Sequence, residues 1–113
     1  MSDTLTITLT GRRPVQIAKG EWPMIASNHE YDGEHECQAN RHERINVRQH
    51  ADGRTLVYGV YSTAWANESD RRRGELLDFG EDIPTAIHRV AESMEFEPAF
   101  AECVIADLPA EEL

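Results

Sequence analysis

Alternation of apolar and polar residues marks a strand near the start of the chain. Residues 4–10 (TLTITLT) place leucine and isoleucine on one face and threonine on the other, which predicts a half-buried strand. A glycine-led loop can then reverse the chain, and the expected hairpin places Leu9 opposite Val15. Because Pro14 cannot donate a ladder hydrogen bond, the second strand is expected to be short or to lie at a sheet edge.

The stretch RINVRQHADGRTLVYGVY, residues 44–61, predicts a second hairpin in the middle of the chain. Asp52-Gly53 is typical of a two-residue turn, because glycine adopts positive φ freely and aspartate tolerates it. With that turn, Ile45 lies opposite Val60, and the apolar residues of both strands share one face. The other face then carries a polar row, which forms either a solvated surface or one side of a binding groove: Arg44, Arg48 and His50.

From Asp82 onward the apolar residues recur with the period of a helix. One continuous stripe is predicted to face the core: Ile83, Ala86, Ile87, Val90, Ala91 and Met94. Asp82 is placed to cap this helix, and Pro84 is tolerated in the first turn, where its missing N–H has no partner within the helix. Pro98 ends this helix or begins a second one, in which Cys103 is predicted to be a small core residue.

Together these segments predict one domain that spans residues 1–113. The expected fold is α+β: an antiparallel sheet of about four strands, arranged as two hairpins, with two C-terminal helices packed on its apolar face. The order of the segments shows no strand–helix–strand alternation, which disfavours a Rossmann-like fold. Trp22, in the apolar run WPMIA, is predicted to cover the core rather than to bind a ligand.

The chain is strongly acidic, with 21 acidic and 11 basic residues and a formal net charge of −10. Such a surface repels nucleic acid on average, so direct binding to DNA or RNA is disfavoured. No apolar run approaches the roughly 20 residues that cross a bilayer, and the N-terminus does not read as a signal peptide, so we expect a cytoplasmic protein without membrane contact. In a reducing compartment, Cys37 and Cys103 are expected to stay free rather than bridged.

The segment between residues 27 and 43 concentrates histidine, cysteine and glutamate. His35, Cys37 and His42 are candidate zinc ligands, because imidazole and thiolate are the usual donors and the first two would share one face of a strand. Their spacing matches no compact zinc site, so the alternative is a polar loop without metal. Cys37 could also serve as a thiolate nucleophile, although the sequence supplies no recognisable third catalytic group. We assign no catalytic residue and no cofactor.

The C-terminal part of the chain carries charge of one sign only. Residues 90–113 contain seven acids and no basic residue: Glu92, Glu95, Glu97, Glu102, Asp107, Glu111 and Glu112. Three of them, Glu92, Glu95 and Glu102, are candidate partner contacts, since a one-signed surface attracts basic proteins and can imitate a row of phosphates. The simpler interpretation is a solvated face that keeps the protein soluble.

Five stretches of the chain resemble a group of small proteins encoded by Gram-negative bacteria, often on integrative or plasmid-like elements. The stretches are RRPV (12–15), EWPMIA (21–26), VRQHADGRTLVYGV (47–60), RRGELL (72–77) and IADLPAEEL (105–113). The group has no assigned activity, so the resemblance implies no catalytic or binding residue. A mobile-element setting implies an accessory role that acts on host proteins. The group differs most from this chain over residues 27–43, which weakens the metal hypothesis.

These observations predict a non-enzymatic accessory protein that acts by binding another protein, either as a monomer or as a homodimer. Its contact regions are expected to be the edge of the central hairpin and the acidic helices, with Arg48 and Arg72 as further contacts. The most specific form of this hypothesis is charge mimicry, in which the acidic surface occupies the nucleic-acid channel of a basic host protein. The alternatives are a zinc-binding or thiol-dependent protein that uses residues 29–42, and a purely structural oligomeric subunit.

Overall fold

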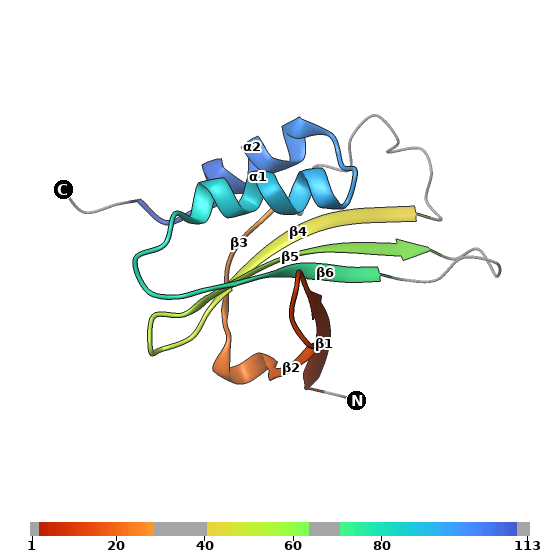
Figure 1. The fold of residues 1–113 in the computed structure, drawn as a ribbon. Coiled ribbons are helices and arrows are strands. Elements are labelled where there is room, and N and C mark those ends of the chain that lie inside the picture. Colours follow the sequence, from red (N-terminus) through yellow and green to blue (C-terminus); the bar gives the residue numbers. More distant parts are fainter. Residues whose placement is uncertain (1–2, 29–40, 64–70, 111–113) are drawn as a thin grey trace.

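The chain folds into a sheet with two helices on one side and a β-hairpin on the other (Figure 1). The computed structural model describes residues 3–28, 41–63 and 71–110, without the side chains of residues 41, 42 and 63. Its elements follow one another in this order: β1 (Thr4–Leu9), β2 (Val15–Ala18), the 3-10 turn η1 (Lys19–Glu21), β3 (Met24–Ser27), β4 (Arg41–Gln49), β5 (Thr55–Thr63), β6 (Arg71–Leu77), α1 (Ile83–Ser93) and α2 (Pro98–Asp107).

The sheet has six strands in the order β2-β1-β6-β5-β4-β3. β1 and β6 run parallel, and all the other neighbours are antiparallel. The predicted α+β class is therefore confirmed. The prediction of about four strands, all antiparallel, was too low in strand number and did not include the parallel pair of β1 and β6. β6 reads RRRGELL and buries only Gly74 and Leu77, so its sequence shows no period-2 alternation that would identify a strand.

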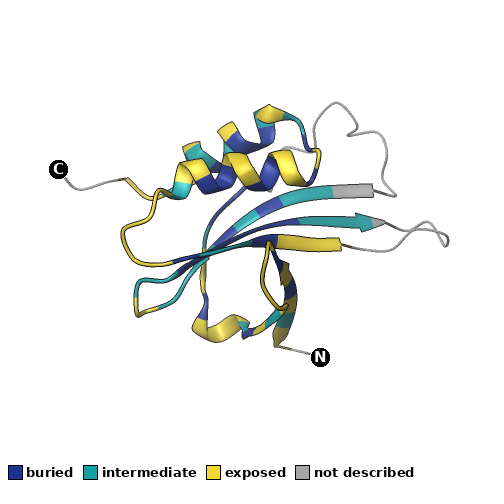
Figure 2. Ribbon diagram, viewed as in Figure 1, coloured by how far each residue is buried: buried dark blue, intermediate teal, exposed yellow. Residues whose placement is uncertain are grey.

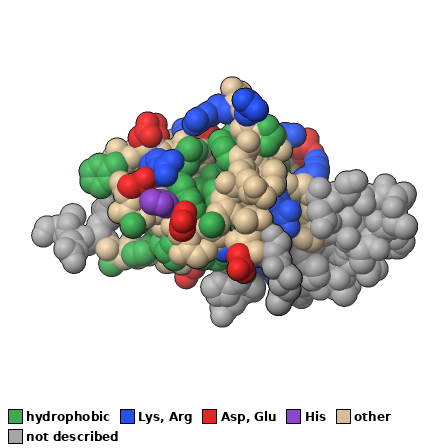
Figure 3. All heavy atoms as spheres, turned by 90° about the horizontal axis from the view of Figure 1, so that it is seen from below, with side chains coloured by type: hydrophobic (Ala, Val, Ile, Leu, Met, Phe, Trp, Pro, Cys, Tyr) green, Lys and Arg blue, Asp and Glu red, His purple; other side chains and the backbone are tan. Residues whose placement is uncertain are grey.

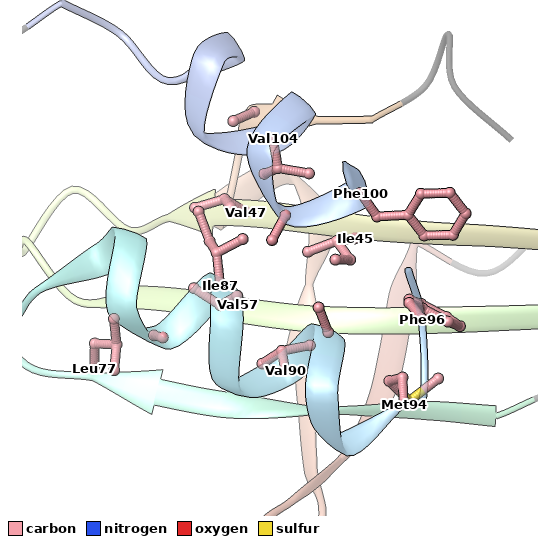
Figure 4. Packing of buried hydrophobic residues seen from close by; sticks show 14 residues of the cluster. Ile45, Val47, Val57, Leu77, Ile87, Val90, Met94, Phe96, Phe100 and Val104 are labelled. Atoms are coloured by element: carbon pink, nitrogen blue, oxygen red, sulfur yellow. The ribbon is translucent and has the colours of Figure 1, made fainter. Parts of the chain in front are cut away.

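The two C-terminal helices cover one face of the sheet, as predicted. Ile87 and Val90 of α1 and Met94, directly after the helix, are 0%, 1% and 5% exposed, and they pack on side chains of the sheet below (Figure 4). Asp82 caps α1 by accepting a hydrogen bond from the Thr85 N–H at 3.2 Å. That hydrogen bond stabilises the carboxylate and lowers the pKa of Asp82 below its usual value.

The central hairpin forms, but its register is one residue away from the predicted one. The His50 N–H donates to the Arg54 carbonyl at 2.9 Å, so the loop holds three residues, Ala51 to Gly53, instead of two. Gly53 takes a φ of 96°, and the Gly53 N–H closes a turn on the His50 carbonyl at 3.0 Å. An Asp-Gly pair suits this turn as well as the two-residue one, because only its last position requires positive φ.

This shift moves the apolar residues of β5 to both faces of the sheet. Ile45 now lies opposite Gly59 and Val47 opposite Val57, all on the helix side. Leu56 and Tyr58, expected on that side, point to the other face instead. β5 is therefore buried from both directions, and the face predicted to be a polar surface holds a second core.

The N-terminal hairpin supplies the other half of this second core. β1 and β2 curl below the sheet, away from the helices, and enclose a cluster of Ile7, Leu9, Ile17, Trp22, Leu56 and Tyr58. Figure 2 shows burial continuing from the central strands into both the helices and this hairpin. The hairpin pairs Ile7 with Val15, two residues away from the predicted register, and an even shift leaves the predicted faces unchanged.

Both edges of the sheet are short strands, β2 and β3. Two side chains finish the β3 edge: Asp107 of α2 accepts from the Ser27 N–H at 2.9 Å, and Asn28 accepts from the Ile45 N–H at 2.8 Å. The central hairpin has β3 beside β4 and β6 beside β5, but β3 pairs only with residues Asn46 to Arg48 of β4. Contact through the hairpin edge therefore stays a prediction.

Candidate protein-interaction surface

One end of the molecule is organised around Trp22, which leads from η1 into β3. The ring of Trp22 is buried, with the His50 ring at 5.0 Å and the Arg54 guanidinium at 5.1 Å from its centroid. Arg48 donates to the Trp22 carbonyl and to the Tyr58 hydroxyl, both at 2.9 Å. These contacts fix the tip of the central hairpin against the start of β3. The prediction that Trp22 covers the core is confirmed.

The loop between β6 and α1 presents an aromatic side chain at the same end. The Glu81 N–H donates to the Asp78 carbonyl at 3.2 Å, and the Asp78 N–H donates to the Glu81 carboxylate at 2.7 Å. With Gly80 at a φ of 90°, these bonds close a tight turn that carries Phe79 at its tip. Phe79 is 84% exposed, although its ring lies against Gly53 of the central hairpin.

Two open hollows lie beside this loop, with volumes of about 660 and 730 Å³. Gly80, Glu81 and Asp82 line the first, and Phe79 lines the second. Ile25 and Gln49 line both of them, so the hollows meet along β3 and the end of β4. The first also lies against the ends of both helices, and its apolar lining comes from Ile25, Ile83, Pro84, Ile105, Leu108 and Pro109. Figure 3 shows apolar side chains gathered toward one end of the lower face, with charged side chains among them.

We call this region the end surface and define it by its exposed or half-buried residues: Glu21, Pro23, Met24, Ile25, Phe79, Glu81, Asp82, Ile83, Ile105 and Leu108. The acidic residues that line its two hollows are Glu21, Glu81 and Asp82; His50 lines the second hollow, and no lysine or arginine of the described ranges lines either. The Arg89 guanidinium on α1 attracts Glu81 and Asp82 electrostatically but does not line a hollow. Because hydrogen bonding lowers the pKa of Asp82, this carboxylate stays ionised at neutral pH.

The predicted acidic contacts lie on the helices, away from this end. Glu92, Glu95 and Glu102 are all exposed, and none has an ion-pair partner within the described ranges. The one arginine of α1, Arg89, is held by Glu75 of β6 through two short contacts of 2.7 and 2.9 Å. That pairing stabilises the guanidinium and raises the pKa of Arg89, so Arg89 does not neutralise the helix carboxylates.

The two predicted basic contacts, Arg72 and Arg48, differ in how accessible they are to a partner. Arg72 is exposed on β6, where a partner could reach it. Arg48 is half-buried, and its donors are engaged by Tyr58 and Trp22 within the second core, so it is a structural residue rather than a free contact. Cys103 is a free thiol that is half-buried instead of sitting in the core as predicted.

Most of the candidate metal ligands lie outside the described residues. His35, Cys37 and the side chain of His42 all lie there, so both the zinc site and the thiol nucleophile stay predictions. Within residues 3–28, 41–63 and 71–110, no three histidine, cysteine or acidic residues gather closely enough to hold a metal ion. None of the helices in these ranges is both long and apolar enough to cross a membrane.

Sequence reasoning missed the residues that mark the end surface. Phe79 stands alone in the polar stretch DFGED, and Met24 belongs to the apolar run WPMIA, in which only Trp22 is assigned a role by the sequence. The sequence does place Phe79 between aspartate and glycine, which is typical of an exposed turn. This pattern could have indicated an exposed aromatic side chain. No sequence pattern indicates the hollows, because their lining residues come from segments that only the tertiary fold brings together.

Comparisons of this chain with protein-family models, with curated protein sequences and with solved structures give no match. The resemblance to small proteins of Gram-negative bacteria therefore stays a prediction.

Proposed function

We propose that this protein is a non-enzymatic accessory domain that binds another protein through the end surface. The exposure of Phe79 carries this proposal. A phenylalanine that is 84% exposed loses the favourable burial of its ring, yet the turn around it is tied by two hydrogen bonds and a positive-φ glycine. The backbone that carries the ring is thus fixed at the surface.

Such an arrangement suits an interface. Aromatic side chains dominate the binding energy of protein contacts, and an anchor that is already fixed loses little conformational entropy on binding. Met24, 44% exposed, adds an adaptable apolar side chain on β3, between Pro23 and Ile25 of the hollows. The hollows beside Phe79 give a partner concave apolar surface to fill.

Affinity capture from lysate of a Gram-negative bacterium, the source that the resemblance implies, tests the proposal. We expect Phe79→Ser to reduce recovery of a specific partner at least about tenfold, as loss of a hot-spot aromatic does. His88→Ser, at an exposed position of α1, is the matched control and should leave recovery unchanged. Equal recovery by all three proteins would remove the end surface as the contact.

Charge mimicry through the helices is a second candidate, favoured by the exposed carboxylates of Glu92, Glu95 and Glu102 that have no ion pair among the described residues. In the same capture experiment, mimicry requires that changing all three to lysine abolish recovery of a basic nucleic-acid-binding protein and that recovery fall steeply with salt. Recovery that changes neither with the three lysine substitutions nor with salt would rule mimicry out and leave the end surface as the contact.

A further inference from the structure

We infer that the end surface receives a cationic amphipathic segment of its partner, in which apolar side chains alternate with lysine or arginine. This inference rests on the proposed function and adds the chemistry of the partner. Two features of the surface lead to it: the joined apolar hollows and the sign of the charge around them.

The shape of the surface calls for more than one apolar anchor. Ile25 and Gln49 form a wall common to both hollows, with the helix ends beyond one side and Phe79 beyond the other. A bound segment can therefore place one apolar side chain in each hollow while its backbone passes over the shared wall. A segment with apolar residues on one face and polar residues on the other meets this requirement.

The charge of the surface indicates which polar residues the bound segment carries. Glu21 lines the hollow next to Phe79, and Glu81 and Asp82 line the hollow next to the helices. Glu81 and Asp82 accept hydrogen bonds from backbone N–H groups of their own turns, which fixes the direction of their charge. Since no lysine or arginine among the described residues lines either hollow, a basic segment finds complementary charge and an acidic one meets repulsion.

The same charges disfavour a second copy of this chain as the occupant. A symmetric dimer through the end surface would be isologous, so each copy would bring Glu21, Glu81 and Asp82 against the same three residues of its partner. Like charges set opposite each other weaken association, and the net charge of −10 adds repulsion between whole molecules. A basic partner avoids both costs.

Three synthetic peptides probe the inference on the full chain. The first contains only leucine and lysine in an amphipathic order, the second replaces every lysine by glutamate, and the third contains lysine alone. In isothermal titration calorimetry we expect the leucine–lysine peptide to bind at least about tenfold more tightly than either of the others, a ratio equivalent to about 1.4 kcal/mol. The third peptide separates amphipathic binding from attraction to an acidic protein.

Variants locate the binding. Phe79→Ser removes the anchor, and the double change Glu21→Gln and Glu81→Gln removes charge while the amide oxygen at position 81 can still accept from Asp78. Each is expected to weaken the leucine–lysine peptide about tenfold. The control is Asp3→Asn, which removes a negative charge at an exposed position outside both candidate surfaces and should leave affinity within about twofold. Unchanged melting temperatures will confirm that each variant is folded.

The inference is overturned if the leucine–glutamate or the lysine-only peptide binds as well, or if the end-surface and control variants weaken binding equally. Light scattering that shows a dimer dissociated by Phe79→Ser would also overturn it, because a second copy would then be the occupant. Its failure differs from failure of the proposed function. If Phe79→Ser abolishes capture of a partner and the cross-linked segment of that partner lacks lysine and arginine, only the inference is refuted. If Phe79→Ser leaves capture unchanged, the proposed function is refuted.

Discussion

Gly74 occupies the point on β6 where β1 and β5 pair on its two sides. A Cβ at this position would overlap the Val57 carbonyl oxygen and lie 2.6 Å from the Tyr58 Cβ. Both neighbours, Val57 and Tyr58 of β5, are fully buried, so they cannot move without disturbing the two cores. Glycine here permits the close approach that lets the sheet curl around the N-terminal hairpin.

Gly74→Ala is therefore expected to destabilise the protein by about 3 kcal/mol or more, measured by urea unfolding. The matched control is Gly20→Ala in η1, where an added Cβ meets nothing within 4 Å and φ is not positive. That variant should stay within about 0.5 kcal/mol of the original protein. Similar stabilities for the two variants would contradict the close packing of β5 and β6.

At the scale of elements, the sequence predicts the helices better than the sheet. α1 was predicted because six apolar residues repeat at helical spacing behind an aspartate cap, and both signals are local. The register of β4 and β5 depends on one turn whose two conformations suit the same Asp-Gly pair, so pattern alone chose wrongly. When a strand is buried on both faces, as β5 is, alternation no longer reports which face meets the helices.

Two valines of β5 distinguish the registers directly. Val57 is fully buried under the helices, whereas Val60 is half-buried on the opposite face; the two-residue turn would exchange their sides. We expect Val57→Thr to destabilise the protein by about 1–3 kcal/mol, because its hydroxyl enters an apolar core. Val60→Thr should cost clearly less in the same chemical denaturation series. The reverse order would support the two-residue turn.

On the scale of the whole molecule, function was the part least accessible from the sequence. The acidic helices are predicted because their charges are contiguous in the chain, and the three predicted contacts, Glu92, Glu95 and Glu102, are indeed exposed. The end surface gathers residues from η1, β3, the loop after β6 and both helices, and only the tertiary fold brings them together.

The structure leaves two separate surfaces for a partner, the end surface and the outer side of α1 and α2. They differ in composition: the first combines apolar hollows with a few carboxylates, and the second offers carboxylates without a comparable exposed aromatic. Binding at the first should weaken less steeply with salt, because apolar burial contributes part of it, whereas binding at the second depends on charge alone and should weaken steeply as salt rises.

Amide hydrogen exchange of the protein, alone and with its captured partner, separates these surfaces in one measurement. We predict that the partner slows exchange in the loop at residues 78–82 and in the hairpin tip at residues 50–53, while the exposed turns of α1 and α2 between residues 88 and 102 exchange as before. Slowed exchange confined to residues 88–102, with Phe79 and Gly80 unchanged, would contradict the assignment of the end surface as the binding site.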